Sequence, residues 1–304
     1  MNWFRNAEKE LNGAIVKNAP LAPLTTMGVG GPARYLAKPR TIDDAIRVRR
    51  IADSEGQSVT VLGGGSNIIV SDEGIKGIVI KLDSDLFREV EKEASGNLWR
   101  VGAGARLSRL VSDAAESGLS GLEPLAGIPG TVGAALRMNA GGKFGSIGSL
   151  VDWVEVIADG ELRRLTPADA GFDYRSSKLD NVLVVRCGLK LAISDPETVR
   201  ARTKEIIDAK AASQPLSARS AGCIFKNPER DSAGRLIEAA GLKGARCGGA
   251  VISERHANFI VNDRSASASD VMTLIRFAHR AVQNQFGINL ELEVKPCGQW
   301  THAA

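Results

Sequence analysis

Apolar residues recur along this chain at two spacings, and each spacing predicts a different kind of element. Apolar positions three or four residues apart indicate one face of a helix, whereas alternating or briefly continuous apolar positions indicate a strand. Helical patterns predict helices over residues 41–55, 107–115, 197–212 and 271–282. Strands are predicted over residues 59–62, 77–82, 98–101, 154–157, 162–165, 182–191, 258–261 and 290–294. The predicted fold class is therefore a mixed α+β fold.

Residues at the ends of these elements support the assignment. Thr41 is suited to cap the first predicted helix, because its hydroxyl can accept a hydrogen bond from a backbone N–H of the first turn. Gly56 and Gly287 are suited to the ends of the first and last predicted helices. Asp159-Gly160 lies between two predicted strands and is typical of a two-residue hairpin turn.

The length of 304 residues predicts more than one domain, because a single core rarely grows so large. The composition changes at Asp195-Pro196, where a charged helical stretch begins and continues almost to Pro215. We expect three subdomains, which comprise residues 1–82, 83–212 and 213–304.

Composition and charge exclude several classes of protein. Apolar residues make up 43% and charged residues 24% of the chain, as in ordinary globular proteins. The net charge of +4 hints at small anionic ligands, but no Lys/Arg run interleaved with aromatic residues indicates a nucleic-acid partner. No stretch of about 18 apolar residues predicts a membrane span, and residues 1–10 are too polar for a signal peptide. We therefore expect a cytoplasmic protein.

The cysteines and histidines predict no metal site. None of the cysteines lies in a C-x-x-C pair, and the three histidines are scattered. Free thiols are expected in a reducing compartment. The cysteines are Cys187, Cys223, Cys247 and Cys297.

A first glycine-rich loop follows the predicted strand at 59–62. Glycines without Cβ atoms let successive N–H groups turn toward an anion, and the next two side chains add hydrogen-bond donors. The alternative is a tight surface turn. The loop consists of Gly63, Gly64, Gly65, Ser66 and Asn67.

A second loop is almost entirely small or turn-forming, and it predicts a wall for a planar or extended cofactor. Close helix packing is the alternative. Two such loops favour a dinucleotide. By contrast, residues 28–33 fit G-x-G-x-x-A but neither follow a strand nor open a helix, so they are not a Rossmann motif. The candidate cofactor residues of the second loop are Gly127, Ile128, Pro129, Gly130, Thr131, Gly133, Asn139 and Gly141.

Taken together, several segments in order along nearly the whole chain resemble the UDP-N-acetylenolpyruvoylglucosamine reductase family, the flavoenzymes called MurB or UDP-N-acetylmuramate dehydrogenase. The combination is specific, whereas no single segment is. The matching residues are 26–32, 62–67, 127–141, 174–177, 220–228, 234–244, 252–262 and 290–294.

The resemblance implies an NADPH- and FAD-dependent oxidoreductase. Residues 1–82 and 83–212 would form an FAD-binding fold of the vanillyl-alcohol oxidase type, and residues 213–304 would bind the substrate. The implied reaction reduces the enolpyruvyl ether of UDP-N-acetylglucosamine to UDP-N-acetylmuramate, a cytoplasmic precursor of peptidoglycan. The implied partners are small-molecule substrates, with no nucleic acid and no membrane, and we expect a monomer.

The resemblance also assigns catalytic roles. Hydride addition leaves enolate-like charge on the substrate carboxylate, and a fixed cation stabilises such charge. Arg175, in Tyr-Arg-Ser-Ser, matches that position, with a structural ion pair as the alternative. Glu293 matches the late glutamate of the family that assists the enolate. Glu291 takes this role if the strand register differs, and an exposed carboxylate without chemistry is the remaining alternative.

Cys223 is the main departure from the family pattern, because it stands where the family usually has a serine proton donor. A thiol, with a reference pKa of about 8.5, is a far stronger acid than an alcohol. We expect the protonated thiol of Cys223 to donate the proton that completes the reaction. A thiolate at this position could not donate a proton, so the alternative is an enzyme with weakened activity. Tyr174, Lys226 and Asn227 are the predicted substrate contacts, with a salt bridge and a turn as alternatives for the last two.

Two rival functions remain open on the sequence. Another flavin oxidoreductase of the same fold would keep both glycine loops but has no need for Arg175, Cys223 and Glu293 together. A non-catalytic relative that binds a UDP-sugar is the second rival, and the cysteine at 223 is the feature that suggests it.

Overall fold

The computed structural model describes residues 2–93, 96–142 and 144–300, and the chain divides into two compact units. Unit 1 comprises Met1–Lys17, Tyr35–Gly64 and Gly77–Ala209, and unit 2 comprises Asn18–Arg34, Gly65–Lys76 and Lys210–Ala304. Each unit buries a hydrophobic core of its own. Both units are therefore assembled from segments that are distant in the sequence. The three-part division of the sequence stays a prediction.

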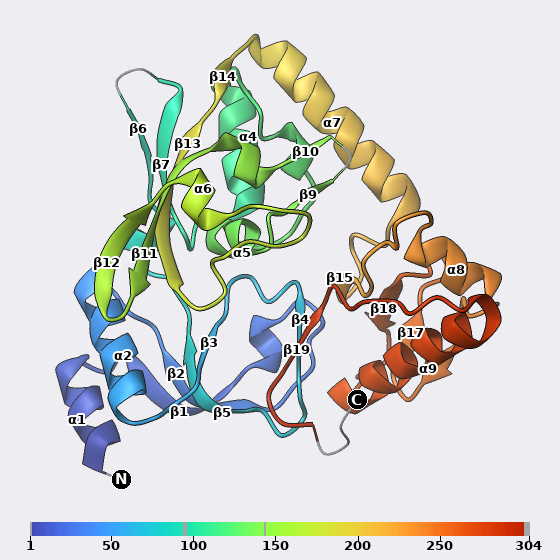
Figure 1. The fold of residues 1–304 in the computed structure, drawn as a ribbon, viewed down its shortest axis with the longest axis horizontal. Helices are drawn as coiled ribbons and strands as arrows, with labels where there is room; N and C mark the ends of the chain where they lie inside the picture. The colour runs from blue at the N-terminus through green and yellow to red at the C-terminus, as the bar shows by residue number, and fades with distance from the viewer. Residues whose placement is uncertain (1, 94–95, 143, 301–304) are drawn as a thin grey trace. The chain divides into compact units, whose positions relative to one another are not determined.

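The centre of unit 1 is a five-stranded antiparallel sheet in the order β12-β11-β13-β7-β6 (Figure 1). Asp159 and Gly160 join β11 to β12, and their φ angles are 51° and 72°. A two-residue hairpin turn of type I′ requires positive φ at both positions, so the predicted hairpin is confirmed. The strands are β6 (Val90–Lys92), β7 (Leu98–Gly102), β11 (Val151–Ala158), β12 (Glu161–Leu165) and β13 (Leu183–Lys190).

Short helices that the sequence pattern did not predict pack against this sheet. Helix α5 contacts β13 and β7, and α6 contacts β11. Helix α2 begins after Thr41, whose hydroxyl accepts a 3.0 Å hydrogen bond from the N–H of Asp44, as expected of the cap. The helices that begin in unit 1 are α1 (Asn2–Glu10), α2 (Ile42–Ser54), α3 (Asp85–Arg88), α4 (Leu107–Glu116), α5 (Val132–Arg137), α6 (Pro167–Ala170) and α7 (Pro196–Ser213), with short 3₁₀ turns η2 (Glu123–Leu125) and η3 (Ile147–Leu150).

A second sheet has the order β1-β2-β5-β3. Strands β3 and β5 are parallel, with Val61 opposite Ile80. Because parallel strands end at the same edge of a sheet, the first glycine loop after β3 and Lys81 after β5 start side by side. The strands are β1 (Ile15–Pro20), β2 (Pro32–Ala37), β3 (Val59–Val61) and β5 (Ile75–Ile80). Two-stranded pairs join β8 (Leu119–Ser120) to β14 (Ala192–Ile193) and β9 (Gly141–Gly142) to β10 (Gly145–Ser146).

Unit 2 packs helices α8 (Ala233–Ala239) and α9 (Ala268–Phe286) with a four-stranded sheet. Asp72 accepts hydrogen bonds of 2.8 and 2.9 Å from the first N–H groups of α9, and Gly287 ends the helix at a φ of 69°. None of the helices in the described ranges is long and apolar enough to span a membrane. The sheet order is β15 (Ser220–Cys223), β18 (Phe259–Asn262), β17 (Ala250–Ile252) and β16 (Arg246–Cys247), and η1 (Ala22–Leu24) also lies in this unit.

The strand predicted over residues 290–294 is wrong. Only Leu292 forms a bridge there, with Phe225, and the N–H groups of Glu293 and Val294 both point to the carbonyl of Ile224. The nearby strand is β19 (Lys295–Cys297), which pairs in parallel with β4 (Ile68–Val70). The alternating apolar residues of this segment reflect burial of Leu290 and Val294 in the core of unit 2. They do not reflect a regular ladder of backbone hydrogen bonds with a neighbouring strand.

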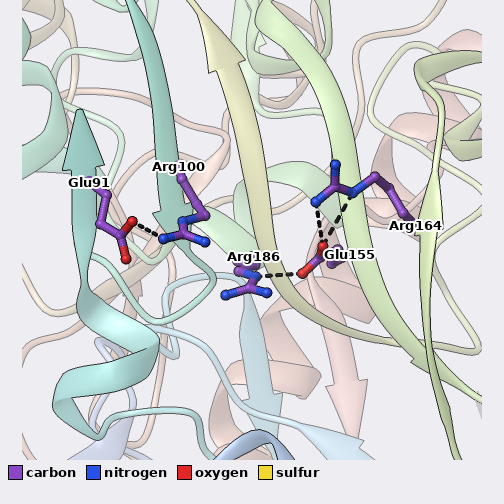
Figure 2. A network of polar contacts seen from close by, with 5 residues as sticks. All are labelled: Glu91, Arg100, Glu155, Arg164 and Arg186. Carbon is purple, nitrogen blue, oxygen red and sulfur yellow. Dashed lines mark hydrogen bonds and ion pairs between the residues drawn. The ribbon is translucent and has the colours of Figure 1, made fainter. Parts of the chain in front are cut away.

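Ion pairs run across the five-stranded sheet of unit 1 (Figure 2). Buried Glu155 on β11 accepts hydrogen bonds of 2.7 Å from Arg164 and 2.5 Å from Arg186, which lie on the two neighbouring strands. Arg100 pairs with Glu91 on β7 and β6. Burial by itself would raise the pKa of Glu155, but the hydrogen bonds from both arginines outweigh burial, so this pKa is lowered.

Candidate active site

Within unit 1, Gly63 and Gly64 of the first glycine loop come into close contact with the second loop. A Cβ atom added to Gly64 would lie 2.6 Å from the Cα of Gly130. One added to Gly63 would lie 2.7 Å from the hydroxyl oxygen of Thr131. Real Cβ atoms do not come this close to other heavy atoms. The small residues that the sequence places in both loops are therefore required for the loops to meet.

Backbone N–H groups in these loops are available to a ligand. Within the described part of the chain, no protein group accepts a hydrogen bond from the N–H of Gly64 or Gly130. Lys81 donates a 2.9 Å hydrogen bond to the carbonyl of Gly63. Because the C=O and N–H of a trans peptide point in opposite directions, the N–H of Gly64 points away from Lys81. Such N–H groups beside small residues suit an anion, for example a phosphate.

Lys81 is partly buried under the first loop. Burial lowers the pKa of its ammonium group, and the neighbouring carboxylate of Asp83 partly offsets this effect. The sequence pattern alone indicates no role for Lys81. The available signal is that a lysine lies near the end of a predicted apolar strand.

Within the second loop, packing explains part of the small-residue pattern. A Cβ atom added to Gly133 would lie 2.8 Å from that of Ala103, so glycine lets α5 approach the end of β7. Thr131 stands at the start of α5, and Ile128 closes a turn through its N–H and the carbonyl of Leu125. The alternative of close helix packing therefore accounts for Gly133.

A tight turn holds Tyr174 and Arg175 beside the second loop. Asp173 and Ser176 exchange backbone hydrogen bonds of 3.0 and 3.2 Å around this turn, and Arg175 has a φ of 53°. The guanidinium group of Arg175 donates a 2.7 Å hydrogen bond to the carbonyl of Gly141. The side chain of Tyr174 is exposed, and the centroid of its ring lies 5.7 Å from the guanidinium carbon of Arg175.

Cys223 and Glu293 lie on neighbouring backbone segments of unit 2. Strand β15 ends at Cys223, and the carbonyl of the next residue, Ile224, accepts a 2.8 Å hydrogen bond from the N–H of Glu293. The side chain of Asn67 donates a 3.0 Å hydrogen bond to the carbonyl of Glu293. Both the N–H and the carbonyl of Glu293 are therefore held by hydrogen bonds within unit 2.

The predicted substrate residues of unit 2 have protein partners. Lys226 forms a 2.5 Å ion pair with Glu291, the alternative to Glu293. The side-chain oxygen of Asn227 accepts a 3.1 Å hydrogen bond from the N–H of Ala233, at the start of α8. The salt-bridge alternative for Lys226 is thus present, Asn227 contacts the start of a helix, and the substrate contacts stay predictions.

Comparison with known proteins establishes the family. A family model for the C-terminal domain of UDP-N-acetylenolpyruvoylglucosamine reductase matches residues 214–297, and a model for an FAD binding domain matches residues 33–166. UDP-N-acetylenolpyruvoylglucosamine reductase 2 of Symbiobacterium thermophilum is 42% identical over 289 residues, which cover 94% of this chain and 93% of that relative. This chain belongs to the UDP-N-acetylenolpyruvoylglucosamine reductase family.

Solved structures agree with this assignment. The crystal structure of UDP-N-acetylenolpyruvylglucosamine reductase (MurB) from Thermus caldophilus matches with a TM-score of 0.83 and 42% identity, over 93% of this chain and 98% of that chain. A VAO-type flavoprotein from Myceliophthora thermophila C1 matches with a TM-score of 0.50 and 15% identity, over 63% of this chain and 47% of that chain, which shows the fold alone. The predicted α+β fold with an FAD-binding part of the vanillyl-alcohol oxidase type is confirmed.

The geometry of unit 1 fits the FAD of this reductase family. The matched FAD binding domain includes Gly63, Gly64 and the whole second glycine loop. The N–H groups of Gly64 and Gly130 offer donors for phosphate oxygens, and the adjoining residues carry little side-chain bulk. FAD is therefore the cofactor that the family and the residues present both support.

Ser177 is a further residue of the reductase motif whose role the sequence did not reveal. Its buried hydroxyl donates a 2.8 Å hydrogen bond to the carbonyl of Arg137 and accepts one of 3.3 Å from the N–H of Leu179. It thus fastens the segment after Arg175 to the end of α5. Its place in Tyr-Arg-Ser-Ser was the only available signal.

Proposed function

We propose that this chain is an FAD-dependent UDP-N-acetylenolpyruvoylglucosamine reductase. It would use NADPH to reduce the enolpyruvyl ether of UDP-N-acetylglucosamine to UDP-N-acetylmuramate, in the cytoplasmic synthesis of peptidoglycan precursors. The observation that carries the proposal is 42% identity to a named reductase across 94% of the chain. We further propose that the protein acts as a monomer, with residues 1–82 and 83–212 binding FAD and residues 213–304 binding the sugar nucleotide.

The glycine loops would hold FAD, which when bound supplies the hydride that reduces the substrate double bond. Gly63, Gly64, Gly127 and Gly130 would contribute small residues and N–H donors, and Lys81 would fix the peptide that presents the N–H of Gly64. The 2.9 Å hydrogen bond from Lys81 to the carbonyl of Gly63 supports this arrangement.

Arg175 would stabilise the negative charge that develops on the substrate. Hydride addition to the terminal carbon of the enolpyruvyl group converts its C=C bond to a single bond and leaves an enolate at the carboxylate. A guanidinium group held in advance stabilises such charge without reorganising during the reaction. The hydrogen bond from Arg175 to the carbonyl of Gly141 supports this role, because it restrains the guanidinium group.

Cys223 and Glu293 would complete the reaction. The thiol of Cys223 would donate its proton to the carbon next to the carboxylate, and the resulting thiolate would regain a proton from solvent. Glu293 would assist the enolate. The hydrogen bond between the N–H of Glu293 and the carbonyl of Ile224, the residue after Cys223, supports a joint role of these segments.

Tyr174, Lys226 and Asn227 would contact the substrate. Lys226 is mostly buried, whereas its partner Glu291 is 72% exposed in its side chain. A substrate diphosphate could replace Glu291 as the partner of Lys226, because the carboxylate of Glu291 is exposed and can return to water. Asn227 would retain its contact with the start of α8.

The test is the product formed by purified protein that shows flavin absorption. With NADPH and the enolpyruvyl sugar nucleotide, mass spectrometry should detect a product two hydrogen atoms heavier than the substrate, formed without oxygen. Consumption of NADPH that requires oxygen and leaves the sugar nucleotide unchanged would instead favour a flavin oxidase. A colourless protein that cannot be reconstituted with FAD would contradict the proposal.

A further inference from the structure

Asn139 connects the second glycine loop to the turn that carries Arg175. Its side-chain N–H₂ donates a 2.9 Å hydrogen bond to the carbonyl of Asp173, the first residue of that turn. Its side-chain oxygen accepts a 3.0 Å hydrogen bond from the N–H of Gly148 in η3. The carboxamide is therefore engaged at both ends by the protein, although the sequence analysis placed it among the cofactor contacts.

The turn needs such support because its backbone is strained. Arg175 has a φ of 53°, in the left-handed region that is unfavourable for residues other than glycine and, to a smaller extent, asparagine and aspartate. Strain of this kind persists where surrounding contacts determine the conformation. Two such contacts are the hydrogen bond from the amide of Asn139 to the carbonyl of Asp173 and the hydrogen bond from the guanidinium group of Arg175 to the carbonyl of Gly141.

Two backbone features beside Asn139 accommodate its carboxamide. A Cβ atom added to Gly148 would lie 2.7 Å from the side-chain oxygen of Asn139, so glycine at 148 is required for the carboxamide to fit. Asn139 itself has a φ of 42°, a conformation that asparagine tolerates better than most residues. The local sequence is thus adapted to the position of the carboxamide.

We propose that Asn139 is a positioning residue for Arg175: its carboxamide fixes the Asp173–Ser176 turn so that the guanidinium group is held ready for the enolate. The inference rests on the proposed function, in which Arg175 stabilises charge only after hydride has reached the enolpyruvyl group. Asn139 therefore matters for the step in which substrate reoxidises the flavin, and not for the binding of FAD or for flavin reduction by NADPH.

Two variants separate the contacts of Asn139. Asn139→Gly removes the carboxamide and keeps a residue that adopts the observed φ. Asn139→Asp keeps an oxygen for the N–H of Gly148 but places a second acceptor opposite the carbonyl of Asp173. Asn12→Gly is the matched control, because Asn12 is exposed on a turn after α1 with a similar φ of 48°. If one Asn139 variant does not fold, the other still tests the contact.

The experiment measures three quantities for each protein: FAD affinity by flavin fluorescence, the anaerobic rate of flavin reduction by NADPH, and the rate of reoxidation by the enolpyruvyl sugar nucleotide. We expect both Asn139 variants to slow reoxidation about tenfold, equivalent to about 1.4 kcal/mol, with the other two quantities within about twofold of the parent. The control should match the parent in all three.

Other outcomes overturn the inference in distinguishable ways. Unchanged reoxidation in both variants shows that the contact does not position Arg175. Weaker FAD binding with normal reoxidation of the bound flavin shows instead that Asn139 is a cofactor contact. Failure of the parent itself to be reduced by NADPH, or to be reoxidised by the sugar nucleotide, overturns the proposed function and this inference with it.

Discussion

Replacing Gly64 by alanine should disturb the contact on which the cofactor site depends. The new Cβ atom would lie 2.6 Å from the Cα of Gly130, whereas ordinary contacts begin at 3.4 Å, so the two loops would have to separate by about 0.8 Å. The atom in the way belongs to the backbone, so no side chain can simply rotate aside. Overpacking of this kind costs about 1–3 kcal/mol.

This cost should appear in FAD affinity, because in the proposed cofactor site the N–H groups of both loops would have to be in place at once. If the bound state carries the whole cost, the dissociation constant of FAD rises about fivefold to 150-fold, at about 1.4 kcal/mol per factor of ten. Part of the cost can also appear in the apoprotein, where it lowers the free energy of unfolding.

Gly142→Ala is the matched control for this experiment. Gly142 lies in β9 near the same loops, its φ is not in the positive range, and a Cβ atom there meets no heavy atom within 4 Å. FAD titration by fluorescence and denaturant unfolding of both apoproteins measure the two effects. Equal FAD affinity and equal stability of the Gly64→Ala and Gly142→Ala variants would show that the loops do not meet as described.

Three further changes test other parts of the account. Cys223→Ala should slow flavin reoxidation by the sugar nucleotide about 10²- to 10⁴-fold, the range for loss of a general acid. Cys223→Ser should retain much of the rate. An alanine variant that is as fast as the parent would exclude the thiol as the proton donor. Lys81→Met should weaken FAD binding about fivefold, because one hydrogen bond of about 1 kcal/mol is lost. Fluorescence titration with FAD measures this change. Unchanged affinity would contradict the proposal that Lys81 fixes the first glycine loop for FAD. Glu155→Gln should lower the free energy of unfolding by about 1–3 kcal/mol at neutral pH. The pKa of Glu155 in the folded protein is lowered from its reference value of 4.5. The ionised carboxylate therefore contributes its full share to the free energy of unfolding above pH 4.5, and this share is lost as the pH falls through the pKa of the folded state. The difference between parent and variant should therefore shrink in acid, and a constant difference in denaturant titrations at several pH values would refute this reasoning.

Local signals predicted the elements of the fold well because the residues that end them act through their own neighbours. Thr41 caps α2 through a residue three positions away, and Asp159-Gly160 forms its hairpin turn by its own φ angles. The alternation at residues 290–294 misled because burial at Leu290 and Val294 comes from a core assembled by distant segments. The same reason explains why the interleaved composition of the two units could not be predicted.

The sequence indicated candidate site residues but not the contacts between them. The glycine loops were found because their composition is unusual over a few consecutive positions. The roles of Lys81 and Asn139 depend on hydrogen bonds to residues 18 and 34 positions away. The sequence places Lys81 near the end of a predicted strand and Asn139 in a glycine-rich loop, but it contains no local signal for the distant partner of either side chain.

The most direct test of the central claim is a two-step anaerobic measurement of the flavin absorbance of the purified protein. NADPH should bleach the flavin bands, and the enolpyruvyl ether of UDP-N-acetylglucosamine, added after NADPH is exhausted, should restore them in the absence of oxygen with formation of UDP-N-acetylmuramate. Bands that stay bleached until oxygen is admitted would contradict the claim that this protein is an enolpyruvyl sugar nucleotide reductase.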